Sequence, residues 1–154
     1  MVLDDQQRRA RAVEKLARVM EGVGMPHGIA QVYSALTLAP GEGLSTSELV
    51  EWLHISRASV STATQFLVSA ELAERYRVRG SREAHYRMVK GSWGPILSRK
   101  FAGAFAVRAS VEEAMEYTES ASARERLEEM RDVYGFFERE FEGTLKRWNE
   151  RNAS

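Results

Sequence analysis

The chain contains no cysteine and only three prolines among its 154 residues. The lack of cysteine excludes a disulfide framework, a thiolate nucleophile and a cysteine-ligated metal site. The longest apolar runs are far shorter than the roughly 20 residues that cross a bilayer, so we expect no membrane partner. The N-terminus lacks a signal-peptide pattern, and we therefore expect a cytoplasmic protein.

The residue patterns that support catalysis are also missing. No nucleophile is paired with a base, no glycine-rich loop could cradle a phosphate, and no metal-ligand spacing is present. His27, His54 and His85 lie on three different predicted elements. None has a carboxylate or a second histidine three or four residues further on, so neither a zinc site nor an acid/base pair is indicated. We expect no enzyme, no cofactor and no metal.

The net charge of zero hides an uneven distribution. Residues 55–90 hold seven Lys or Arg against three Glu, a net charge of +4, whereas residues 110–154 hold seven basic against twelve acidic residues. Salt screens charges beyond about 10 Å, so only the local balance acts on a nearby phosphate backbone. The middle of the chain therefore has a basic footprint.

The segment 44–72 has the form of two short helices joined by a tight turn. Ser45 and Glu48 fit a capping box at the start of the first helix. That helix should stop near His54, and Ser56 can cap a second helix that runs to about Ala70. The apolar stripe of the first helix consists of Leu49, Trp52 and Leu53. This is the layout of a helix-turn-helix DNA reader.

The second helix has a buried and an exposed side by its 3.6-residue period. The side with Val60, Ala63, Thr64 and Leu67 should pack inward. Small residues on the other side let a helix enter a major groove about 12 Å wide, and hydroxyl, amide and guanidinium groups can bind phosphates and base edges. The alternative is a polar face that is merely solvated. The candidate DNA-contacting residues are Ser56, Arg57, Ala58, Ser59, Ser61, Thr62 and Gln65.

Residues 73–89 alternate apolar and charged side chains on both sides of a turn, which predicts a β-hairpin. Tyr76 and Val78 should face one way; on the second strand, Ala84, Tyr86 and Met88 can cover the core, which leaves His85 and Arg87 outward. Arginines at a hairpin tip can bind phosphates or a narrow minor groove. An edge hairpin kept soluble by charge is the alternative; we favour DNA because basic residues concentrate here. The candidates are Arg75, Arg77, Arg79, Gly80, Ser81 and Arg82.

Long helical patterns flank this lobe. Residues 4–22 and a segment from Pro26 predict two helices, and a long helix should begin at Ser92 or Trp93 with Ile96, Leu97, Phe101 and Phe105 on its inner face. A final helix is predicted from Ala123 to about Arg151. Its near-heptad seam predicts packing against another helix, either the first helix of the same chain or a second copy, and we expect both. The seam consists of Leu127, Met130, Tyr134, Phe137, Phe141, Leu145 and Trp148.

The helix, turn, helix and arginine-tipped wing between long helices resemble a winged helix-turn-helix regulator of the MarR superfamily. Residues 24–28, 56–67 and 77–88 more narrowly resemble its GbsR-type branch. The resemblance implies one mainly α-helical domain over residues 1–154 with a small β-hairpin wing. Segments 1–24 and 92–151 would form the dimerisation helices, and 25–90 the DNA-binding lobe.

The resemblance also implies a function. We expect a homodimer that binds double-stranded DNA, acts as a repressor, and recognises an inverted repeat with half-sites about 10 bp apart. Such regulators often bind a small effector, here an apolar or cationic one, although ordinary core packing also explains the pocket candidates. A winged-helix module that docks proteins is the alternative function, which the polar helix face disfavours. The pocket candidates are Met20, Met25, His27, Tyr33, Trp52, Trp93, Phe101 and Phe105.

Overall fold

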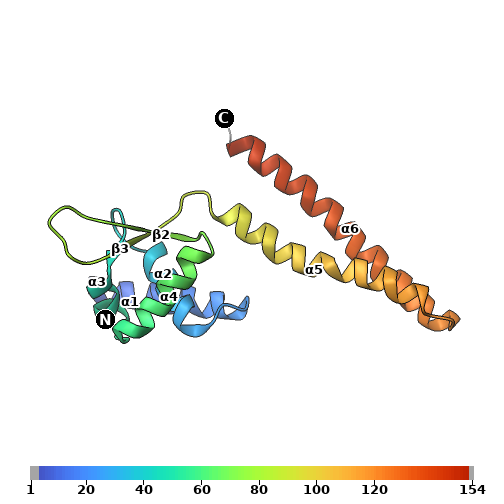
Figure 1. Cartoon of the computed structure of the whole chain (residues 1–154), viewed down its shortest axis with the longest axis horizontal. Helices are drawn as coiled ribbons and strands as arrows, with labels where there is room; N and C mark the ends of the chain where they lie inside the picture. The colour runs from blue at the N-terminus through green and yellow to red at the C-terminus, as the bar shows by residue number, and fades with distance from the viewer. Residues whose placement is uncertain (1–3, 153–154) are drawn as a thin grey trace. The chain divides into compact units, whose positions relative to one another are not determined.

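A computed structural model describes residues 4–152 as helices with a small antiparallel sheet (Figure 1). The chain divides into two compact units, the first ending at Ser92 and the second beginning at Trp93. Unit 1 contains α1 (Asp5–Gly22), α2 (His27–Thr37), β1 (Leu44–Ser45), α3 (Thr46–Leu53), α4 (Arg57–Ser69), β2 (Ala73–Tyr76) and β3 (His85–Met88). Unit 2 contains α5 (Trp93–Glu116) and α6 (Ala121–Asn152). The predicted fold class, mainly α-helical with a small β wing, is confirmed.

The two helices of the predicted helix-turn-helix begin and end where their capping residues stand. The Ser45 amide donates to Glu48 Oε2 at 2.6 Å, and the Glu48 amide donates to Ser45 Oγ at 3.1 Å, which completes the capping box. α3 ends at His54, which adopts a left-handed conformation with φ of 52°. α4 begins after Ser56, whose Oγ accepts from the Ser59 amide at 3.0 Å.

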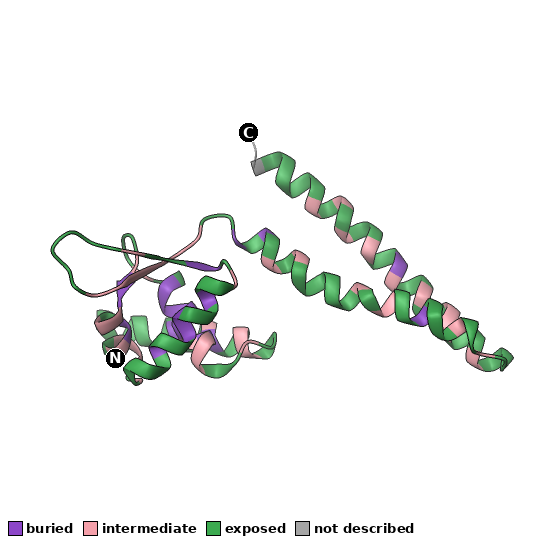
Figure 2. Ribbon diagram, in the orientation of Figure 1, coloured by how far each residue is buried: buried purple, intermediate pink, exposed green. Residues whose placement is uncertain are grey.

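The core of unit 1 lies around α2, which packs against α1, α3 and α4 (Figure 2). This follows from its composition, because α2 has a run of buried residues from Val32 to Leu36. Burial of this many apolar side chains is the main favourable term for folding. The other helices each contribute a narrower apolar stripe: Val13 and Ala17 from α1, Leu49 from α3, and Val60, Ala63 and Leu67 from α4.

The sheet has three strands in the order β1-β3-β2, so one strand was missing from the sequence prediction. The sequence predicted segment 44–72 as two helices and a turn, but Leu44 pairs with Tyr86 and Ser45 with His85. A two-residue strand is too short to show an alternating pattern. Gly43 permits the approach, because a Cβ at this position would lie 2.1 Å from the Tyr86 carbonyl oxygen and its φ is +127°.

The hairpin is shorter than predicted, and residues 77–84 form a loop between β2 and β3. Arg77 and Arg79 therefore lie in this loop and not on a strand. The Ala84 carbonyl accepts from the Thr46 amide at 3.1 Å, which continues the β1–β3 register by one residue pair. The β2–β3 ladder ends because the Val78 carbonyl accepts from the Ser81 amide at 3.0 Å and the Glu83 amide donates to Ser81 Oγ at 3.2 Å, so these groups do not pair across the hairpin.

The strand register determines which side chains of the two strands share a face. Tyr76 pairs with His85, and Arg75 pairs with Tyr86. Because directly opposite residues share a face of an antiparallel pair, Tyr76 lies on the side of His85 and Arg87, opposite to Tyr86 and Met88. The Tyr76 hydroxyl donates to the Glu42 carbonyl at 3.1 Å.

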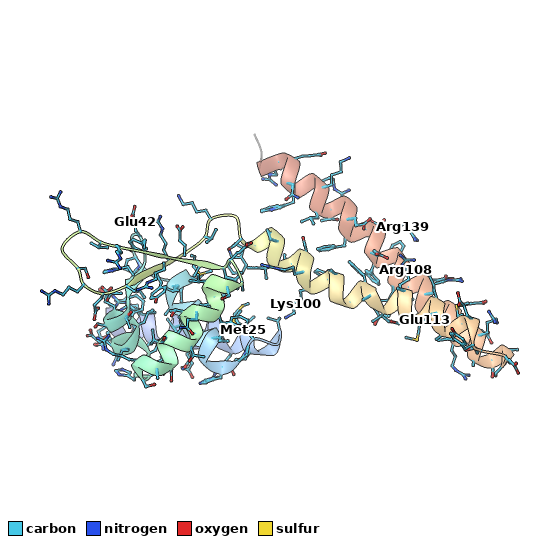
Figure 3. The ribbon with its side chains drawn as sticks, in the orientation of Figure 1. Met25, Glu42, Lys100, Arg108, Glu113 and Arg139 are labelled. Carbon is cyan, nitrogen blue, oxygen red and sulfur yellow. The ribbon has the colours of Figure 1, made fainter. Side chains whose placement is uncertain are left out.

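Unit 2 is a pair of helices that pack along one another. Phe101 of α5 and Phe141 of α6 have ring centroids 4.2 Å apart. Arg108, labelled in Figure 3, donates to Glu138 Oε2 at 2.6 Å and to Glu112 Oε1 at 2.9 Å, and both carboxylates raise the pKa of Arg108. Leu97 was predicted on the inner face of α5 but is 48% exposed.

Candidate nucleic-acid interface

The outward side of α4 is exposed along its length. Val60, Ala63, Thr64 and Leu67 are buried, as the helical period predicted. The buried Thr64 hydroxyl donates to the Val60 carbonyl at 2.9 Å, which satisfies it inside the core. The seven residues predicted from the sequence are all exposed, as are Phe66, Val68 and Ser69 near the end of the helix. The seven are Ser56, Arg57, Ala58, Ser59, Ser61, Thr62 and Gln65. This side of α4 is therefore accessible to a groove.

Arg75, Arg77, Arg79 and Arg82 of the hairpin are exposed and, among residues 4–152, form no ion pair within 4.0 Å. Arg75 ends in solvent on β2, and Arg77, Arg79 and Arg82 lie in the 77–84 loop. The loop turns at Gly80 with a φ of +85°, and the Ser81 amide donates to the Val78 carbonyl at 3.0 Å. Four guanidinium groups are thus available to an anionic partner.

Glu83 joins this loop to both helices of the helix-turn-helix, a connection that sequence reasoning missed. Its Oε1 accepts from Arg57 Nη2 at 2.9 Å and from the Ser47 hydroxyl, and its Oε2 accepts from the Ser47 amide at 3.3 Å. These Ser47 and Arg57 bonds lower the pKa of Glu83 to about 2. Glu83 is therefore ionised at any physiological pH.

The loop also completes the cap of α3. The first amides of a helix have no partner within the helix. Here the Ser45 and Glu48 amides bond within the capping box, the Thr46 amide donates to the Ala84 carbonyl, and the Ser47 amide donates to Glu83. The hairpin thus supplies half of the acceptors at the start of α3.

Arg87 was predicted to point outward, and its guanidinium lies against neighbouring side chains on the surface of the sheet. Its Nε donates to Glu74 Oε1 at 2.6 Å, its Nη1 lies 3.5 Å from Glu42 Oε2, and its guanidinium lies 4.8 Å from the Tyr76 ring centroid. The two carboxylates raise the pKa of Arg87. Arg57 and Arg87 are thus both neutralised by glutamates, and the free positive charge of the lobe is concentrated in Arg75, Arg77, Arg79 and Arg82.

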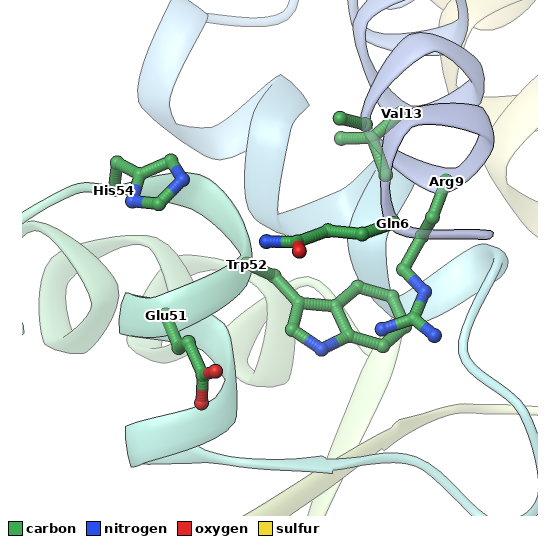
Figure 4. A pocket seen from close by; sticks show the side chains of 7 residues that line it. Gln6, Arg9, Val13, Glu51, Trp52 and His54 are labelled. Carbon is green, nitrogen blue, oxygen red and sulfur yellow. The ribbon is translucent and has the colours of Figure 1, made fainter. Parts of the chain in front are cut away.

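The residues predicted to line an effector pocket fall in both units. In unit 1, the Arg9 guanidinium lies 4.1 Å from the Trp52 ring centroid, beside a hollow of about 230 Å³ (Figure 4). His27 Nδ1 lies 2.8 Å from Glu21 Oε1. Tyr33 is completely buried, which raises its pKa to about 12. Met20 and Met25 are half-buried. In unit 2, Trp93 is 45% exposed, and Phe101 and Phe105 line an apolar groove.

This groove lies between α5 and α6 and has a volume of about 600 Å³. Along the predicted seam of α6, Leu127, Tyr134, Phe141 and Leu145 are half-buried. Met130, Phe137 and Trp148 are 42%, 60% and 52% exposed, and the neighbouring Val133 and Phe136 are 49% and 54% exposed. Within the hairpin, α5 thus covers only one edge of the seam.

Among residues 4–152, none of the helices combines the length and the apolar composition that are needed to span a bilayer. The same range contains no group of three His, Cys, Asp or Glu side chains that could hold a metal ion.

Part of the chain matches a known protein family, and the chain as a whole is similar in fold to a solved structure. Residues 91–151 match the family of MmpR5-like MarR family transcriptional regulators. A protein solved as "a transcriptional regulator" is 21% identical over 93% of this chain and 99% of its own, with a TM-score of 0.68. This likeness shows the fold, and that protein, like the matched family, is described as a transcriptional regulator.

More distant structures include MepR of S. aureus bound to an oligodeoxyribonucleotide, 16% identical over 83% of this chain and 88% of its own, with a TM-score of 0.44. FabT of Streptococcus pneumoniae in complex with DNA is 17% identical over 83% of this chain and 96% of its own, with a TM-score of 0.36. No curated protein matches the chain. The chain thus shares the fold of a solved transcriptional regulator, and its residues 91–151 match the MmpR5-like MarR family.

Proposed function

We propose that this protein is a dimeric, sequence-specific DNA-binding transcriptional regulator that acts as a repressor. The observation that carries the proposal is the salt bridge between Arg57 and Glu83, with a distance of 2.9 Å. It joins the exposed side of α4 to the 77–84 loop and its arginines. A groove-sized polar helix and four unpaired arginines are thereby part of one surface. Base edges would be read by α4, and phosphates would be bound by the loop.

The dimer is the second part of the proposal, and the uncovered edge of the α6 seam supports it. A stable soluble protein rarely leaves large contiguous apolar patches exposed. The near-heptad spacing suits another helix, and a two-fold copy of the same hairpin is the commonest partner. Two copies would place the α4 helices about one turn of DNA apart.

The most specific parts of the proposal are that the protein belongs to the GbsR-type branch and that it binds a small effector. The branch is supported by the residues at 24–28, 56–67 and 77–88. For a cationic effector, Trp52 already binds the Arg9 guanidinium on its ring face, and a ligand there would have to replace Arg9. Titration with tetramethylammonium chloride, read by tryptophan fluorescence, tests this part; a response that persists in Trp52→Leu, which has no ring face, would contradict it.

The DNA-binding part is tested with Arg79→Ala and Arg82→Ala. Each lost phosphate contact should lower the slope of log affinity against log salt by about 0.9. Affinity for all duplexes should fall, because phosphate contacts do not read sequence. Gel shifts at several salt concentrations measure this, with Lys146→Ala on α6 as the control. Slopes that match the unsubstituted protein would rule out the loop as the anchor.

A further inference from the structure

The carboxylate of Glu83 occupies a set of donors that would otherwise suit a phosphate. It accepts from the Ser47 amide, the Ser47 hydroxyl and the Arg57 guanidinium, close to the start of both α3 and α4. A backbone amide at a helix start, a hydroxyl and a guanidinium are the groups that bind DNA phosphates. The protein thus fills these positions with an anion of its own.

The Glu83 carboxylate balances the charge of Arg57, the first residue of α4. Its Nη2 donates to Ser47 Oγ at 2.6 Å and to Glu83 at 2.9 Å, so its charge is balanced from within the protein. The loop arginines nearby have no such partner among residues 4–152. Arg57 keeps other N–H groups that can donate to a base edge, because a guanidinium carries five donors.

We propose that Glu83 determines sequence selectivity by withholding the Arg57 charge from the DNA backbone. This inference rests on the proposed function, since it has meaning only for a DNA-binding protein. Contacts to phosphates supply essentially all of the affinity for unrelated sequences. An arginine that is neutralised at the start of the reading helix therefore contributes little to unspecific binding, while its free donors remain available for a base.

The test is Glu83→Gln, with Glu74→Gln as the matched control. Both substitutions remove one negative charge and one glutamate that pairs with an arginine. Arg57 loses Glu83 in the first, whereas in the second Arg87 loses Glu74 but keeps Glu42 as a partner at 3.5 Å. Glu83→Gln should bind unrelated duplex DNA more tightly, with a salt slope steeper by about 0.9, which gives a roughly threefold larger loss of affinity between 50 and 200 mM salt. Selectivity for the operator over unrelated DNA should fall.

The added slope should disappear in the double variant Glu83→Gln with Arg57→Gln, because Arg57 is its source. A Glu83→Gln slope and selectivity equal to those of Glu74→Gln would overturn the inference and leave the proposed function intact. If the parent protein fails to bind any duplex, the proposed function fails, and this inference fails with it.

A variant that does not fold, judged by circular dichroism, is replaced by Arg57→Gln alone. Since Arg57 is already neutralised, this substitution should lower the salt slope by clearly less than Arg79→Ala does. Equal decreases would mean that Arg57 binds a phosphate directly, which contradicts the role assigned to Glu83.

Discussion

At the residue scale, the position of each positive charge matters more than the total. Arg57 and Arg87 are held by glutamates, whereas Arg79 and Arg82 extend from the loop without an ion pair among residues 4–152. Exposed and unpaired guanidinium groups can bind phosphates without first giving up a partner. We therefore assign anchoring to the loop and sequence reading to the polar residues of α4.

The reading role is tested at Thr62 and Gln65, which are both exposed on α4. Substitution of Gln65 by Ala should change the preferred base at one position in each half-site and cost about 1 to 3 kcal/mol on the parental operator. Thr62→Ala should do the same at a neighbouring position. Selection from random DNA measures the preference.

The control for this selection is Ser69→Ala, an exposed residue at the far end of α4. It should leave the selected motif as it is. If Gln65→Ala and Thr62→Ala also return the parental motif, another side of α4 faces the bases.

Sequence reasoning located most of these residues but missed Glu83. The α4 residues were predictable because a single helical period separates buried from exposed positions. Glu83 and Ser47 are 36 residues apart, and no local pattern indicates that they meet. The same limit applies to Arg87, whose neutralisation by Glu74 depends on the strand register.

At the element scale, helices were predicted more accurately than strands. Capping residues and apolar stripes mark helix ends locally, as at Ser45 and Ser56. The β2–β3 ladder ends early because Val78 and Glu83 bond to Ser81 within the loop. β1 consists of two residues and exists only through its pairing with β3. Long-range pairing of this kind leaves no period in the sequence.

The exposed edge of the α6 seam, which includes Phe137, is predicted to form the dimer contact. Phe137→Glu places a charge where a second copy would pack, and burial of an unpaired charge is costly. We expect a monomer in sedimentation equilibrium and operator affinity weaker by roughly a hundredfold, because two linked half-site contacts become one.

Arg139→Glu is the control for this prediction, since it places the same side chain at an exposed position two residues further along α6. It should remain dimeric. A Phe137→Glu protein with the parental mass and affinity would show that this edge of α6 does not form the dimer.

At the scale of the whole molecule, the account combines a reading lobe in unit 1 with a dimerising hairpin in unit 2. The family match covers residues 91–151 and so includes both helices of this hairpin. Symmetry then links the protein to its target: two copies related by a two-fold axis require a DNA site with the same symmetry.

The most direct measurement is selection of bound duplexes from a random DNA pool with the full chain at physiological salt. The account predicts an inverted repeat whose half-sites lie about 10 bp apart, centre to centre. Recovery of no enriched motif, or of a single unpaired half-site, would contradict it.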